Sequence, residues 1–159
     1  KMNMKRIDMK WLMLLLCLPL LMTACDWEDL PAYEEAEISA VQFYYRWPSD
    51  AKDPVTGEPI VKEQRLNTTN NVNSEAGTVE VSVSVPGASG DFTESVRNEV
   101  SVSRLWGQAT ISTAARMSPI NGSPAMGTPG DWSKENKYEV MAADGTKKIW
   151  TIKIIQFDK

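Results

Sequence analysis

The sequence predicts an all-β fold: an antiparallel β-sandwich of about seven short strands in residues 38–159. Short segments in which apolar and polar residues alternate recur along this region, and clusters of Pro, Gly and Asn separate them. No long stretch of helical periodicity follows the first 24 residues. Strands with one apolar face need a second layer to cover that face, and a two-sheet sandwich supplies it.

Three strands are predicted in the first half of this region. Residues 41–47 alternate, with Val, Phe, Tyr and Trp sharing one face. Residues 78–85 alternate valine with polar residues and give the cleanest pattern in the chain. Residues 60–66 carry charges that suit an exposed edge strand. The turn-rich segment 48–59 and the polar segment 67–77 are predicted to be loops.

The second half contains two further strands, a long loop and a closing hairpin. The strands are predicted at residues 100–107 and 109–114, and residues 116–134, rich in Gly and Pro, form the loop. Residues 137–142 and 149–157 are predicted to pair around an Asp-Gly turn. Both faces of the last strand are apolar at several points, which indicates a central position in its sheet.

The N-terminal segment is typical of an export signal. Its basic residues are Lys1, Lys5, Arg6 and Lys10. Residues 11–22 are apolar but too few to span about 30 Å of hydrocarbon as a helix. Residues 21–25, Leu-Met-Thr-Ala-Cys, resemble the lipobox of bacterial lipoproteins, which implies cleavage before Cys25 and lipid attachment to it. A plain secretory signal cut after Ala24 is the alternative.

The predicted organisation is therefore a lipoprotein signal peptide in residues 1–24, a lipidated N-terminus and acidic tether in residues 25–37, and the sandwich in residues 38–159. The acidic residues directly after Cys25 resemble the tag that exports Bacteroidetes-type lipoproteins to the outer face of the outer membrane. An aspartate after the cysteine also resembles an inner-membrane retention signal of enterobacteria. Three acidic residues favour the outer membrane, with the lipid on Cys25 as the anchor and the domain facing the cell exterior.

Charge and composition exclude several classes of function. Removal of residues 1–24 leaves 13 of 17 basic and 20 of 21 acidic residues, so the net charge changes from −4 to about −7. Such a chain repels phosphate backbones, and we expect no nucleic-acid partner. The sequence contains no histidine, which removes Ser-His-Asp and Cys-His catalysis and the usual zinc ligands. We expect no enzyme, no cofactor and no bound metal.

The closing hairpin carries a more specific resemblance. Residues 138–152, Tyr-Glu-Val-Met-Ala-Ala-Asp-Gly-Thr-Lys-Lys-Ile-Trp-Thr-Ile, resemble the last hairpin of Ig-like domains in surface lipoproteins of polysaccharide-utilising gut bacteria. Residues 36–38 and 109–119 are also similar to that family. The resemblance implies an Ig-like β-sandwich encoded beside outer-membrane transporters of the starch-utilisation type, and it brings no catalytic residues.

The sequence thus predicts a non-catalytic binding or interaction module, accessory to a TonB-dependent nutrient importer. Its partners would be the transporter and its lipoprotein lid, or a glycan or peptide cargo. A structural fimbrial or surface-layer subunit is an alternative. Fimbrial subunits exported as lipoproteins are matured by trypsin-like cleavage at an arginine soon after the lipidated cysteine. The first arginine after Cys25 is Arg46, inside a predicted strand, which weighs against this alternative. A small glycoside hydrolase is a third possibility, with Asp131 and Glu135, or Glu94 and Glu99, as carboxylate pairs.

Two tryptophans are the candidate contacts with a ligand or partner. Trp132 lies in the Gly/Pro-rich loop, where its ring could stack on a sugar, insert into a partner protein, or pack within the loop. Trp106, next to Gly107 at a predicted strand end, is the second candidate. Trp47 and Trp150 share strand faces with other apolar residues, and we expect both in the core.

Overall fold

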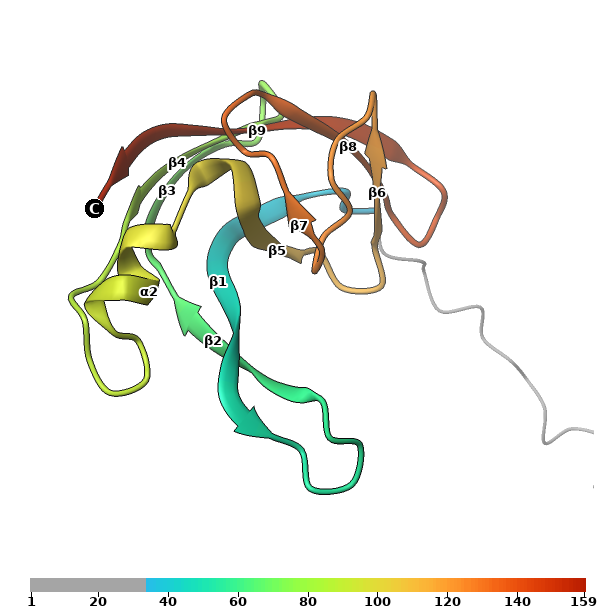
Figure 1. The fold of residues 1–159 in the computed structure, drawn as a ribbon. Coiled ribbons are helices and arrows are strands. Elements are labelled where there is room, and N and C mark those ends of the chain that lie inside the picture. The colour runs from blue at the N-terminus through green and yellow to red at the C-terminus, as the bar shows by residue number, and fades with distance from the viewer. Residues whose placement is uncertain (1–33) are drawn as a thin grey trace, which may run out of the picture. The chain divides into compact units, whose positions relative to one another are not determined.

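The computed structural model describes residues 34–159, and the predicted signal peptide, Cys25 and most of the tether lie outside them. Nine strands and two short helices follow one another in this part of the chain (Figure 1). Their bounds are β1 Ile38–Lys52, β2 Pro59–Arg65, β3 Asn67–Asn73, β4 Thr78–Ser84, α2 Glu94–Glu99, the 3₁₀ helix η2 Val102–Arg104, β5 Leu105–Ile111, β6 Arg116–Ile120, β7 Pro129–Gly130, β8 Asn136–Met141 and β9 Lys147–Asp158. Neither helix of these residues has the length and apolarity to cross a membrane.

The strands form two sheets that face each other, which confirms the predicted sandwich. Sheet A has the strand order β2-β1-β5-β7, and sheet B has the order β3-β4-β9-β8-β6 (Figure 1). Sheet A is entirely antiparallel. In sheet B, β4 and β9 pair in parallel, so the prediction of an antiparallel sandwich is wrong for this one pair. β9 is the middle strand of its sheet, as its two apolar faces indicated.

The core consists of the strand faces that alternation predicted. On β1 the buried face carries Val41, Phe43, Tyr45 and Trp47. On sheet B the buried apolar residues are Val79, Val81, Val83, Tyr138, Val140, Trp150 and Ile152. Trp150 is fully buried and its indole Nε1 donates a hydrogen bond to the Ala36 carbonyl, 2.9 Å away. Trp47 and Trp150 are therefore core residues, as predicted.

Residues 67–77 were expected to be a loop, yet residues 67–73 form β3, an edge strand of sheet B. The segment lacks an apolar face, so its sequence alternation does not reveal a strand. Its place is fixed instead by Asn70, whose side chain accepts a hydrogen bond from the Val41 amide at 2.8 Å and donates one to the Val41 carbonyl at 3.0 Å. Buried Leu66 marks the point where the chain passes from sheet A to sheet B.

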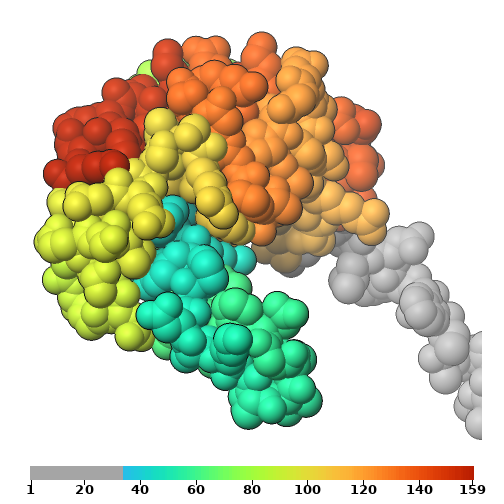
Figure 2. Space-filling model, in the orientation of Figure 1, coloured from blue at the N-terminus to red at the C-terminus, as the bar shows by residue number. Residues whose placement is uncertain are grey.

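Two further loop predictions are partly wrong. The segment 48–59 is shorter, because β1 continues to Lys52 beyond an irregularity in its pairing with β2. The β1–β2 hairpin consequently extends beyond the rest of the sandwich (Figure 2). The long loop 116–134 contains β6, which pairs with β8, and the two-residue β7, which pairs with β5. Residues 102–104, predicted as strand, form the 3₁₀ helix η2.

Gly107 of β5 permits a close packing contact in the core. Its backbone lies against the six-membered ring of Trp132, and a Cβ at this position would overlap that ring. Gly107 has no positive φ, so the requirement for glycine is steric. The strand can therefore hold Trp132 against it only while residue 107 has no side chain.

We predict that Gly107→Ala destabilises the domain by about 1–3 kcal/mol, because the added methyl group overpacks the core against Trp132. Gly87→Ala is the matched control: a Cβ there meets nothing within 4 Å, so its effect on the free energy of unfolding is expected to be small. Urea unfolding followed by far-UV circular dichroism measures both. Equal stability of the two variants would show that the Trp132 contact relaxes without cost.

Candidate binding surface

Trp132, the first candidate contact residue, is buried in the core. Only 1% of it is exposed, and its indole Nε1 donates a hydrogen bond to the Leu105 carbonyl at 3.1 Å. Its ring stacks on Tyr138 with a centroid distance of 6.2 Å and meets the edge of Phe43 at 4.8 Å. Of the roles that the sequence allowed, the structure shows packing, because no face of this ring is open to a ligand.

The loop around Trp132 is held by its own polar residues. Hydrogen bonds from the Ser133 hydroxyl and amide to the Asp131 carboxylate lower the pKa of Asp131. Buried Asn136 donates to the carbonyls of Asp131 and Lys134. The Tyr138 hydroxyl donates to the Pro124 carbonyl at 2.8 Å, and burial raises the pKa of Tyr138. The loop is thus a cover over one part of the core.

Trp106, the second candidate, lies on the outer face of sheet A and is partly exposed. Trp106 is paired with Tyr44 of β1 on one side and with Pro129 of β7 on the other. Tyr44 is paired in turn with Arg65 of β2. Residues directly opposite each other in antiparallel strands share a face. Arg65, Tyr44, Trp106 and Pro129 therefore form one row across all four strands, here called the aromatic row.

Polar side chains flank the aromatic row on both sides. On one side the strand pairing places Gln42 opposite Gln108, and on the other it places Arg46 opposite Glu63. The Arg46 Nε donates to Glu63 at 2.5 Å, and the Arg46 Cζ lies 5.9 Å from the centre of the Trp106 ring. Arg65 donates to the Gln42 side-chain oxygen at 2.8 Å. Rings and planar polar groups thus lie side by side on the outer face of sheet A.

Sequence reasoning found Trp106 but missed Tyr44 and Arg65 as its neighbours. The alternation in β1 already placed Gln42, Tyr44 and Arg46 on the face opposite the core. Which residues lie beside them on β2 and β5 depends on strand register, and the local pattern does not fix that register. The signal that could have found the row is the coincidence of Tyr44 and Trp106 on the polar faces of two strands.

The carboxylates considered for hydrolysis have separate partners. Asp131 accepts from Ser133, whereas Glu135 pairs with Lys153 at 3.3 Å. Glu94 lies 3.8 Å from Arg97, and Glu99 accepts a hydrogen bond from the Tyr45 hydroxyl at 3.4 Å. Burial, followed by the charge of Glu99, raises the pKa of Tyr45. Residues 34–159 contain no group of three His, Cys, Asp or Glu side chains placed to hold a metal ion.

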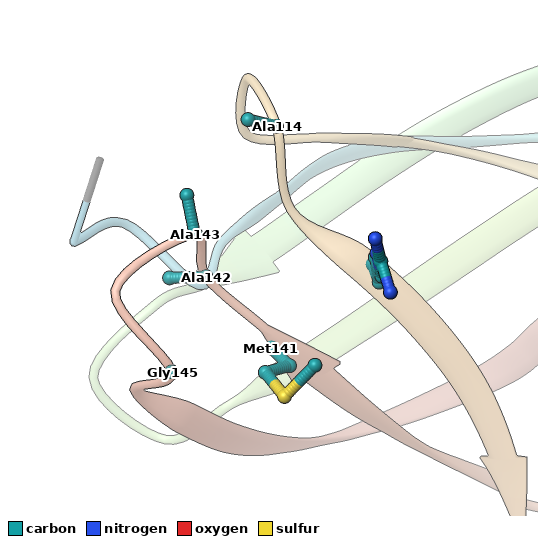
Figure 3. A pocket seen from close by; sticks show the side chains of 6 residues that line it. Ala114, Met141, Ala142, Ala143 and Gly145 are labelled. Carbon is teal, nitrogen blue, oxygen red and sulfur yellow. The ribbon is translucent and has the colours of Figure 1, made fainter. Parts of the chain in front are cut away.

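Two open depressions lie away from the aromatic row. One, of about 350 Å³, is lined by Arg116 of β6 and by small residues of two turns, including Ala114 and Gly145 (Figure 3). The other, of about 410 Å³, lies between the base of the β1–β2 hairpin and α2, where Lys62 and Asp91 form an ion pair at 3.0 Å. Among the residues that line the first, only Arg116 has a polar side chain, and in the second the Lys62–Asp91 ion pair already satisfies two of the charges.

The fold and the surface together define a class: a small two-layer β-sandwich domain with an aromatic row on the outer face of its four-stranded sheet. Residues 38–153 match the family described as DUF5018-related, and the chain belongs to that family.

Two solved structures from Bacteroides species are similar to the chain. A candidate secreted protein from Bacteroides fragilis is 53% identical, with 81% of this chain and 100% of that chain covered and a TM-score of 0.75. A candidate glycoside hydrolase from Bacteroides thetaiotaomicron is 18% identical, with 81% of this chain and 27% of that chain covered and a TM-score of 0.44. A search of curated proteins finds no match.

The two candidate tryptophans differ in burial, and we predict that their removal has different consequences. Trp132→Ala leaves a cavity in the core and removes the hydrogen bond to the Leu105 carbonyl, with an expected loss of about 3–5 kcal/mol of unfolding free energy. Trp106→Ala removes an outer-face cross-strand contact and should cost about 1 kcal/mol or less. Denaturant unfolding followed by circular dichroism distinguishes them. Equal losses would mean that Trp106 also acts as a core residue.

Proposed function

We propose that the protein is a lipid-anchored, non-catalytic binding module on the outer face of the outer membrane. In this role it is accessory to a TonB-dependent import complex of the starch-utilisation type and handles glycan or peptide cargo. The observation that carries the proposal is the aromatic row, because partly exposed rings flanked by amides and guanidinium groups are suited to binding and perform no chemistry themselves. The secreted character described for the similar Bacteroides fragilis protein supports an extracellular location.

A non-catalytic role also agrees with the state of the carboxylates. Glycoside hydrolysis needs two carboxyl groups that face one sugar from opposite sides, with one of them raised in pKa. Here Asp131, of the first candidate pair, has a lowered pKa, because Ser133 stabilises its charged form. Glu135, its candidate partner, forms an ion pair with Lys153 instead.

Co-purification tests the accessory role. The tagged, lipidated protein is extracted from native membranes in mild detergent, and mass spectrometry identifies the proteins that accompany it. We expect a transporter and its lipoprotein lid in near-stoichiometric amounts. The Cys25→Ser variant, extracted in the same way, is the control for carry-over. Recovery of the protein alone from intact membranes would overturn the accessory role and leave an independent surface module.

Lipid attachment is a separate prediction with its own internal control. We expect metabolic labelling with a palmitate analogue to mark the wild-type protein and the Cys17→Ser variant, because Cys17 lies within the predicted signal peptide. Cys25→Ser should abolish the label. Protease treatment of intact cells should then digest the labelled protein at the surface. Labelling that survives Cys25→Ser, or a labelled protein that resists protease on intact cells, would contradict the anchor or its orientation.

A further inference from the structure

We propose that the aromatic row binds a linear glycan that carries carboxylate groups. In this arrangement sugar rings stack on Trp106 and Tyr44 while a sugar carboxylate binds the Arg46 guanidinium. The inference rests on the proposed function and names the ligand class of that same surface.

The length and direction of the aromatic row suit an extended chain. Its four residues lie on four adjacent strands. Neighbouring strands are about 4.8 Å apart, so the row extends over roughly 14 Å, the length of a short oligosaccharide. Because every residue of the row belongs to a strand, the surface is held in place before a ligand arrives.

The charges beside the row favour an acidic sugar. Arg46 and Arg65 stand next to the rings, and the only acidic side chain in the pairs that flank the row is Glu63. The chain as a whole has a net charge of −4, so this face differs in sign from the average surface. Glu63 occupies the Nε edge of Arg46. The two Nη groups of Arg46 then remain able to bind a carboxylate in a forked geometry.

One sugar can reach both groups. The Arg46 Cζ lies over the Trp106 ring, 5.9 Å from its centre, so the guanidinium and the ring are both within reach of one sugar residue. A sugar stacked on that ring would hold its carboxylate beside Arg46. The amides of Gln42 and Gln108, on the other side of the row, can both donate to and accept from sugar hydroxyls.

The surroundings favour a glycan over a protein or an apolar peptide. Protein interfaces have an apolar centre, and large exposed aliphatic residues mark such centres. In the described part of the chain these residues are Val55, Ile60, Val61, Ile149 and Ile155. None of them belongs to the aromatic row or to the pairs that flank it, and the nearest, Val61, lies opposite Pro48 in the next pair along β1 and β2. Two aromatic rings within a polar frame match sugars, which present apolar ring faces and polar edges.

The test uses the full-length protein in detergent and two forms of one polymer. Polygalacturonate carries a carboxylate on every sugar, and its fully methyl-esterified form is the neutral comparison. Affinity electrophoresis or isothermal titration calorimetry gives the dissociation constants. We expect polygalacturonate to bind at least tenfold more tightly than the ester, and the difference to shrink as salt concentration rises.

Substitutions then assign the binding to the row. Trp106→Ala and Tyr44→Ala should each weaken polygalacturonate binding about tenfold or more, while Arg46→Gln should reduce the preference for the acid over the ester. Ile149→Ala, at an exposed residue of sheet B, is the control that should leave binding unchanged. If Trp106→Ala fails to fold, the Arg46→Gln variant retains both rings and carries the test alone.

Three results would overturn the inference: no binding of polygalacturonate, equal binding of acid and ester, or binding that the row substitutions leave unchanged. Saturable binding of a peptide by the row, without binding of the polymer, would do the same. Each of these results is independent of co-purification with a transporter. Loss of the ligand class therefore leaves the accessory role standing, and loss of the accessory role leaves the glycan surface standing.

Discussion

The packing of Trp132 on Gly107 is the constraint on which the rest of the domain depends. The Trp132 indole donates a hydrogen bond to the Leu105 carbonyl and packs against Gly107 and Phe43 of sheet A. It also stacks on Tyr138 of sheet B. One side chain from the loop before β8 thus contacts both layers. Because protein interiors are close-packed, a ring in this place fixes the separation of the two sheets and leaves no room for a side chain at residue 107.

The same contact determines which way the aromatic row faces. In a strand, successive side chains point to opposite faces, so a Gly107 that faces the core requires Trp106 to face outward. With Gly107 held in the core, a slip of one residue in the pairing of β1 with β5 would turn Tyr44 into the core and expose Phe43. Burial of Trp132 therefore specifies the register, and the register assembles the row on the outer face.

Burial and alternation made much of the fold predictable. The strands at residues 41–47 and 78–85 and the closing hairpin each have one face in the core, and that condition gives a sequence period of two. The edge strands β3 and β6 escaped prediction because neither has a fully buried face. The parallel pairing of β4 with β9 joins residues such as Val79 and Ile152, 73 positions apart along the chain, and has no local signal. Burial of Trp132 was equally hidden, since Gly107 and Phe43, which its ring contacts, come from other parts of the chain.

The burial of Trp132 and Trp106 differs from what the composition around them suggested: the loop residue Trp132 is buried, and Trp106 on β5 is partly exposed. A tryptophan among Gly and Pro residues looks accessible, but the glycine that makes space here lies on β5, where it admits the ring into the core. The accessible tryptophan belongs to that same strand. A surface built on paired strands loses little conformational freedom when a ligand binds, whereas a loop must first be ordered. Two fixed rings with adjoining charges can therefore support binding without a cleft, and this is why we assign recognition to the sheet face and leave the Trp132 loop a structural role.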